Sequence, residues 1–104
     1  MTAERLFVYG SLKRGERHHR ELAGARFLGE AQTPPGYVLD ALGDYLALVP
    51  QAGAGSVVGE LFELPSERFF ALDEFEGADY ERVSLDVLFG AEKVKALAYV
   101  KRAR

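Results

Sequence analysis

The chain has 104 residues, 48% of them apolar, with 13 Lys and Arg against 16 Asp and Glu, no Cys and two His. A chain of this length is expected to fold as one domain, residues 1–104, and to bury roughly 60–70% of the surface that the unfolded chain exposes. The lack of Cys excludes disulfides, a thiolate nucleophile and Cys-based metal sites, and the adjacent His18 and His19 point in different directions and are poorly placed to share a metal.

The first half of the chain predicts short strands separated by turns. An apolar run over Leu6–Tyr9 ends at Gly10 and predicts a buried strand. Pro34 and Pro35 predict a turn, because proline has a fixed φ and disfavours a helical residue before it. The other expected elements are a polar loop over Lys13–Glu16, a short helix over Arg17–Ala23, an extended stretch over Phe27–Thr33, and strands over Tyr37–Leu39 and Tyr45–Val49.

The second half predicts one helix among longer strands. A strand is expected over Ser56–Leu64, followed by a helix over Ser66–Glu76 that Ser66 caps and Gly77 ends. Tyr80–Phe89 and a last strand containing Val94, Leu97, Tyr99 and Val100 are expected to pair as an antiparallel hairpin. Strands dominate and few helices separate them, so the predicted class is α+β with a mixed or barrel-like sheet.

Charge is distributed unevenly along the chain. Residues 1–26, 27–92 and 93–104 carry net charges of +3, −11 and +5. A pI of about 5.4 and a basic end without interleaved aromatics give little support for nucleic-acid binding, so we expect a solvated surface with a basic tail. The basic N-terminal segment could help to attract an anionic small molecule.

Nothing in the sequence predicts a membrane segment. The longest stretch without a charge, residues 45–59, is shorter than the roughly 20 apolar residues that a membrane helix needs. The first residues lack the apolar core and cleavage site of a signal peptide. We therefore expect a soluble, cytoplasmic protein. No pattern in the sequence indicates its oligomeric state.

Glu76 occupies an unexpected position on the predicted helix. With Phe69 placed at 0° and ~100° per residue, Glu76 falls near ~340°, within the apolar face, whereas Glu74 falls near ~140° on the outer face. Burial and the negative end of the helix dipole would both raise the pKa of Glu76. This is typical of a functional carboxyl, but a side chain that swings into solvent or pairs with Arg82 fits equally well. Asp73, near ~40°, is expected to be a structural hydrogen-bonding residue.

The loop at Tyr9–Leu12 is the second candidate feature. Gly10 would let the backbone approach a ligand, and consecutive N–H groups from Gly10 to Leu12 could form an anion-binding concavity. A plain turn explains the same residues. Ser11 lacks the Gly-x-Ser-x-Gly setting of a nucleophile elbow, and no pattern assigns His18 or His19 as its base.

Taken together, several blocks of the chain resemble the γ-glutamylcyclotransferase-like superfamily, in particular its small members close to γ-glutamylamine cyclotransferase and the plant avirulence-induced proteins. The blocks are Phe7–Gly15, Gly59–Phe62, Leu72–Gly77 and Tyr80–Arg82, and they span nearly the whole chain. The resemblance implies a small mixed β-barrel with a few packed helices.

The resemblance also implies a reaction, the cyclisation of a γ-glutamyl amine or γ-glutamyl amino compound to 5-oxoproline with release of the free amine, without metal or organic cofactor. Glu76 would be the catalytic general acid and base, because it ends the Leu-Asp-x-x-Glu pattern. A small amine is expected, because the chain lacks the additional segments of larger members. The substrate-binding residues implied by the resemblance are Tyr9, Gly10, Ser11, Leu12, Tyr80 and Tyr99.

Two other functions agree with the same residues. One is a non-catalytic module of the same fold that binds a metabolite. The other uses the same chemistry to remove a γ-glutamyl protecting group from a biosynthetic intermediate.

Overall fold

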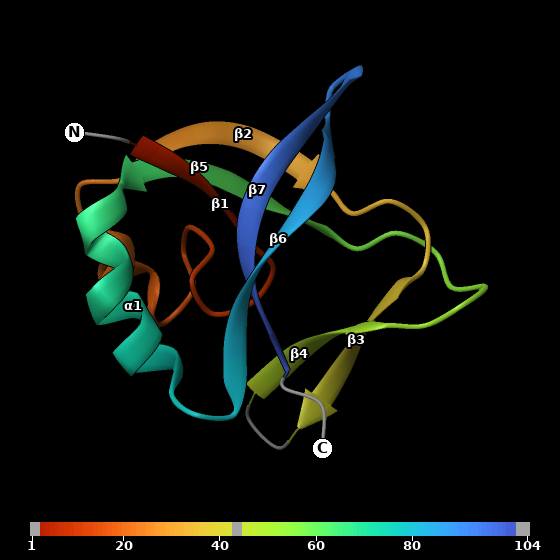
Figure 1. The fold of residues 1–104 in the computed structure, drawn as a ribbon, viewed down its shortest axis with the longest axis horizontal. Helices are drawn as coiled ribbons and strands as arrows, with labels where there is room; N and C mark the ends of the chain where they lie inside the picture. The colour runs from red at the N-terminus through yellow and green to blue at the C-terminus, as the bar shows by residue number, and fades with distance from the viewer. Residues whose placement is uncertain (1–2, 43–44, 102–104) are drawn as a thin grey trace.

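The computed structural model describes residues 3–42 and 45–101, and within them a closed barrel has the strand order β1-β5-β2-β6-β7, while β3 and β4 form a separate sheet (Figure 1). This confirms the predicted α+β class with a small mixed barrel. In chain order the elements are β1 (Ala3–Val8), a 3₁₀ turn (His19–Leu22), β2 (Arg26–Gln32), β3 (Tyr37–Leu42), β4 (Tyr45–Pro50), β5 (Val58–Pro65), a 3₁₀ turn (Ser66–Arg68), α1 (Phe69–Glu76), β6 (Tyr80–Phe89) and β7 (Glu92–Lys101).

The barrel closes through pairs that lie far apart in the sequence. β5 is antiparallel to β1 on one side and to β2 on the other. β6 and β7 form the predicted hairpin, and β2 meets β6 at Gln32 and Leu88. The parallel pair of β1 and β7, at Leu6 and Leu97, completes the ring and makes the sheet mixed. Closure removes the exposed strand edges that an open sheet would present.

Gly59 allows β5 to cross closely over the end of β1. A Cβ atom at this position would lie 2.3 Å from the carbonyl oxygen of Val8 and 2.7 Å from Cζ of Phe7. No larger residue fits without movement of the backbone. The close crossing places Glu60 opposite Val8, where β1 ends and the Tyr9–Leu12 loop begins.

The core consists of two apolar clusters on opposite faces of β1. Successive side chains of a strand point to opposite faces, and Phe7 accordingly packs with Leu61 and Val87 in one cluster. Leu6 packs in the other cluster with Phe69 and Leu72 of α1. The helix is therefore fixed against the outside of the barrel, and its last turn lies near the end of β1.

Two local predictions were right only in part. Only the 3₁₀ turn His19–Leu22 forms in place of the predicted helix over Arg17–Ala23, because the preceding residues are held in loop hydrogen bonds, such as that from the N–H of His18 to the carbonyl of Ser11 at 3.0 Å. Ser66 is not the N-cap residue of α1: it begins a 3₁₀ turn, and the N-cap residue is Arg68, whose side chain forms no capping hydrogen bond.

The C-terminal end of the helix is as predicted. α1 ends at Glu76, and Gly77 has a φ of 79°, a conformation that favours glycine. The N–H of Gly77 donates to the carbonyl of Asp73 at 3.0 Å. None of the described helices has the length and apolar character needed to cross a membrane.

Candidate active site

A cavity of about 550 Å³ opens where the end of β1, the last turn of α1 and the first residue of β6 meet. In Figure 1 the loop that follows β1, coloured red to orange, lies between the barrel and α1. The cavity brings together every residue that the sequence predicted for the site, namely Tyr9, Gly10, Ser11, Leu12, Glu76, Tyr80 and Tyr99.

Glu76 lies in the cavity wall with its carboxyl half-buried. Within the described residues it forms no hydrogen bond or ion pair. Burial raises the pKa of Glu76 from 4.5 to about 7. Arg82, the predicted alternative partner, instead pairs with Asp73, with 3.5 Å between Nη2 and Oδ2. The carboxyl can therefore take up or release a proton near neutral pH.

The tyrosines of the cavity form hydrogen bonds to backbone carbonyls or to a carboxylate. Tyr9 donates its hydroxyl to the carbonyl of Tyr99 at 2.6 Å, and Tyr80 donates to the carbonyl of Leu46 at 3.3 Å. Tyr99 donates to Oδ1 of Asp73 at 2.7 Å, which confirms the structural role predicted for Asp73. Burial first, and then nearby negative charge, raises the pKa of Tyr9 and of Tyr99. Neither phenol is placed to serve as a base at neutral pH.

The Tyr9–Leu12 loop has unpaired backbone donors. The carbonyl of Gly10 accepts from the N–H of Lys13 at 3.1 Å, but within the described chain the N–H groups of Gly10, Ser11 and Leu12 donate to no acceptor. A Cβ at Gly10 would meet the side chain of Leu46 at 3.8 Å, which is ordinary van der Waals contact. Packing against Leu46 therefore does not require glycine at this position.

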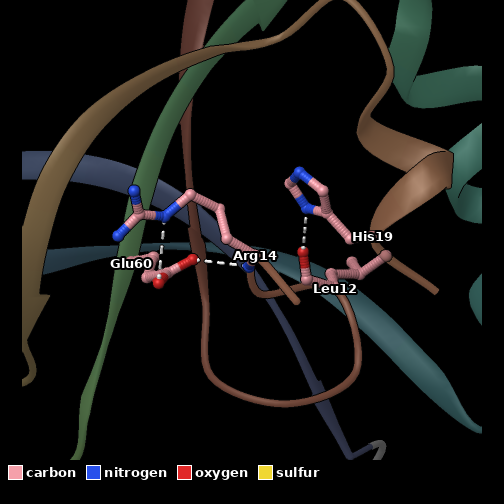
Figure 2. A network of polar contacts seen from close by, with 4 residues as sticks. All are labelled: Leu12, Arg14, His19 and Glu60. Atoms are coloured by element: carbon pink, nitrogen blue, oxygen red, sulfur yellow. Dashed lines mark hydrogen bonds and ion pairs between the residues drawn. The ribbon is translucent and has the colours of Figure 1, made fainter. Parts of the chain in front are cut away.

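Two side chains anchor this loop from opposite sides (Figure 2). Glu60 on β5 accepts from the backbone N–H of Arg14 at 2.8 Å and from its Nε at 3.4 Å. The guanidinium of Arg14 also lies 3.6 Å from the ring centre of Phe27. On the other side, Nδ1 of His19 donates to the carbonyl of Leu12 at 2.8 Å. Contacts from β5 and from His19 therefore hold the first part of the loop.

The cavity also contains residues that the sequence reasoning did not assign to it. Nδ1 of His18 lies 3.0 Å from Oγ of Ser11, and the His18 and Phe75 rings form a T-shaped pair with 5.1 Å between ring centres. The basic character of the N-terminal segment could have indicated Lys13, Arg17 and His18 as residues near an anion-binding site. No local pattern predicts Leu46, which lies on β4. The remaining lining residues are Phe7, Val8, Lys13, Glu16 and Arg17.

The described residues contain no group of three or more His, Asp or Glu side chains arranged to hold a metal ion.

Comparisons with known proteins agree on one family. A model of the family "Gamma-glutamyl cyclotransferase, AIG2-like" matches residues 6–104. The rat γ-glutamylaminecyclotransferase is 34% identical over 92 residues, covering 79% of this chain and 62% of the rat protein. The Escherichia coli family protein YtfP is 32% identical over 89 residues, covering 84% of this chain and 76% of YtfP. The crystal structure of a mouse AIG2-like protein superposes with a TM-score of 0.86 at 26% identity, covering 100% of this chain and 80% of the mouse chain.

Proposed function

The chain belongs to the γ-glutamyl cyclotransferase, AIG2-like family, and on this premise we propose that it cyclises a γ-glutamyl amine, or a related γ-glutamyl amino compound, to 5-oxoproline and free amine. The observation that carries the proposal is the pairing of two features in one cavity. Glu76 supplies a half-buried carboxyl without a partner among the described residues, and the Gly10–Leu12 loop supplies backbone donors without acceptors.

The chemistry requires proton transfer more than a protein nucleophile. The α-amine and the γ-carbonyl belong to the same substrate molecule, so ring closure depends on holding that molecule folded. Glu76 removes a proton from the α-ammonium, and the freed amine attacks the γ-carbonyl carbon to form the new C–N bond. The ring nitrogen loses a second proton to solvent, the bond to the leaving amine breaks, and Glu76 returns its proton to that amine, which departs neutral and takes up a further proton from solvent. A carboxyl with a pKa of about 7 suits both steps.

The loop supplies the complementary electrostatics. Preorganised N–H groups stabilise negative charge that develops in a transition state, particularly where water is excluded. In the proposed complex the N–H groups of Gly10 to Leu12 hold either the α-carboxylate of the glutamyl group or the oxyanion of the tetrahedral intermediate. Tyr9, Tyr80 and Tyr99 form the wall against which the glutamyl chain folds.

The proposed leaving group is an amine without a peptide attached. The similarity to the rat γ-glutamylaminecyclotransferase supports this choice. A purified sample incubated with γ-glutamyl amines, γ-glutamyl amino acids, γ-glutamyl-ε-lysine and glutathione should release 5-oxoproline fastest from a γ-glutamyl amine. Faster turnover of glutathione would contradict the substrate class.

Glu76→Gln tests the mechanism. General acid and base catalysis contributes about 10²–10⁴-fold, so kcat/KM should fall by that factor while the circular dichroism spectrum is unchanged. Glu74→Gln, on the exposed face of the same helix, is the matched control and should retain full activity. If Glu76→Gln retained most of the activity, the assignment of the base would be wrong. Tight binding without product by the unmodified protein would instead favour a binding module.

A further inference from the structure

Two carboxyl groups on α1, one helical turn apart, have opposite surroundings. Asp73 accepts the hydroxyl of Tyr99 at 2.7 Å and pairs with Nη2 of Arg82 at 3.5 Å. Glu76, three residues later, has neither a hydrogen bond nor an ion pair within the described residues. Residues three apart on a helix are neighbours on its surface, with about 5–6 Å between their Cβ atoms. The same cation and hydroxyl could therefore serve either carboxyl with only a small movement.

We propose that Asp73 is a positioning residue that holds Arg82 and the Tyr99 hydroxyl away from Glu76, so that the Glu76 carboxyl keeps no partner and is available for proton transfer. Only the role of Glu76 in proton transfer rests on the proposed function; the part of the proposal that concerns how Asp73 holds Arg82 and Tyr99 does not.

The position of Arg82 supports this role. Its guanidinium lies 4.9 Å from the ring centre of Phe69, the first residue of α1, and it pairs with Asp73 in the middle of the helix. Both contacts hold the guanidinium toward the start of α1, whereas Glu76 ends it. Tyr99 is held in turn by the hydrogen bond from Tyr9 to its carbonyl at 2.6 Å.

The alternative arrangement would weaken Glu76 as a proton carrier. A guanidinium within about 4–6 Å of a carboxylate stabilises the charged form and lowers its pKa. The pKa of Glu76 is raised to about 7 with burial as its cause. Asp73 thus neutralises the charge of Arg82, and burial remains the cause that sets the pKa of Glu76.

Other titratable and charged groups also face the cavity that contains Glu76. The loop after β1 contributes Tyr9, the basic side chains and one acid, whereas β6 and β7 contribute Tyr80 and Tyr99. The groups that line the cavity are Tyr9, Lys13, Glu16, Arg17, His18, Tyr80 and Tyr99. Asp73 is linked to this set through its hydrogen bond from Tyr99, and Arg82 through its ion pair with Asp73. The contacts that bind Asp73 to other side chains come from Arg82 and Tyr99, so the expected effect of Asp73 runs through these two residues.

The test is a carbon-13 NMR titration of the Glu76 carboxyl in the full chain. In Asp73→Asn, Arg82 loses its counter-ion, and the titration midpoint of Glu76 should fall by about one pH unit or more. In the double variant Asp73→Asn with Arg82→Gln the midpoint should return close to that of the unmodified protein. Glu74→Gln removes an equal charge from the exposed face of α1 and should leave the midpoint nearly unchanged.

Two outcomes would overturn the proposal. The first is an Asp73→Asn midpoint that falls no further than that of Glu74→Gln. The second is a fall that persists in the double variant, because it would come from removal of the Asp73 charge and not from Arg82.

Kinetics give a second readout. If the proposed function holds, the acid limb of the kcat/KM profile should move to lower pH in Asp73→Asn together with the NMR midpoint, and should recover in the double variant. A wild-type protein that forms no 5-oxoproline would contradict the proposed function, whereas the NMR titration would still decide the role of Asp73.

Discussion

At the scale of single residues, Glu76 is a source of instability as well as the proposed catalytic group. A carboxyl that loses water on folding resists ionisation, and burial raises the pKa of Glu76 from 4.5 to about 7. Below the lower value the carboxyl is protonated in both the folded and the unfolded chain. Between the two values the folded chain keeps a proton that the unfolded chain has released, so the free energy of unfolding falls as the pH rises.

Glu76→Gln should therefore stabilise the protein at alkaline pH. At about pH 8 the free energy of unfolding should exceed that of the unmodified chain by about 1–3 kcal/mol, because no buried charge has to form, whereas at about pH 4 the two should be nearly equal. Urea unfolding at both pH values measures the difference. An advantage of the same size at both pH values would show that packing, and not ionisation, is responsible.

At the scale of elements, the loop between β1 and β2 depends on side chains from elsewhere for its shape. It contains a single short 3₁₀ turn, His19–Leu22, and its first part is held by Glu60 from β5 and by His19. The side chain of Glu60 is 14% exposed and that of Arg14 is 53% exposed, so the carboxylate is the better shielded member of the pair. Preorganisation of the Gly10–Leu12 donors follows from these contacts.

Glu60→Gln should impair binding more than chemistry. Loss of charge-assisted hydrogen bonds to Arg14 loosens the loop, and we expect KM for a γ-glutamyl amine to rise roughly tenfold with a smaller change in kcat, because Glu76 is held by α1. Steady-state kinetics check this expectation. Glu63→Gln on the same strand removes the more exposed pair with Arg26 and serves as the control. Equal effects of the two changes would argue against a special role for Glu60.

At the scale of the whole molecule, the structure combines a closed barrel with a two-stranded sheet beside it. In Figure 1 the sheet of β3 and β4 lies at the lower right, across β6 and β7 from α1. Each barrel strand has a partner on both sides, whereas β3 and β4 pair only with each other in the described residues. A two-stranded sheet alone is marginally stable, so these strands depend on contacts with the barrel and on the hydrogen bond from Tyr80 to Leu46.

Hydrogen exchange should separate the two parts. Backbone amides of β3 and β4 should exchange faster than those of β5 and β7, because opening the small sheet exposes less apolar surface than opening the barrel. Mass spectrometry of peptides covering each strand measures this. Equal protection of all strands would show that the small sheet opens only when the whole molecule unfolds.

The periodicity of the sequence determined those features that depend on neighbouring residues. The helical repeat placed Glu76 on the buried face of α1 and Glu74 outside, and both positions are as predicted. The glycine after the helix and the alternation from Tyr80 to Phe89 likewise indicated the helix end and the hairpin. Helical and strand periods act over a few residues, so local patterns are sufficient to reveal them.

The tertiary structure alone decided which distant residues contact one another at the site. No local pattern shows that Arg82 pairs with Asp73 and not with Glu76, that Glu60 holds the loop at Arg14, or that Leu46 from β4 reaches the cavity. The parallel pair of β1 and β7 that closes the barrel joins residues about ninety positions apart. Such contacts form because many strands must bury their apolar faces together. That free energy depends on how distant segments fit in three dimensions, which the periodicity of a single segment does not specify.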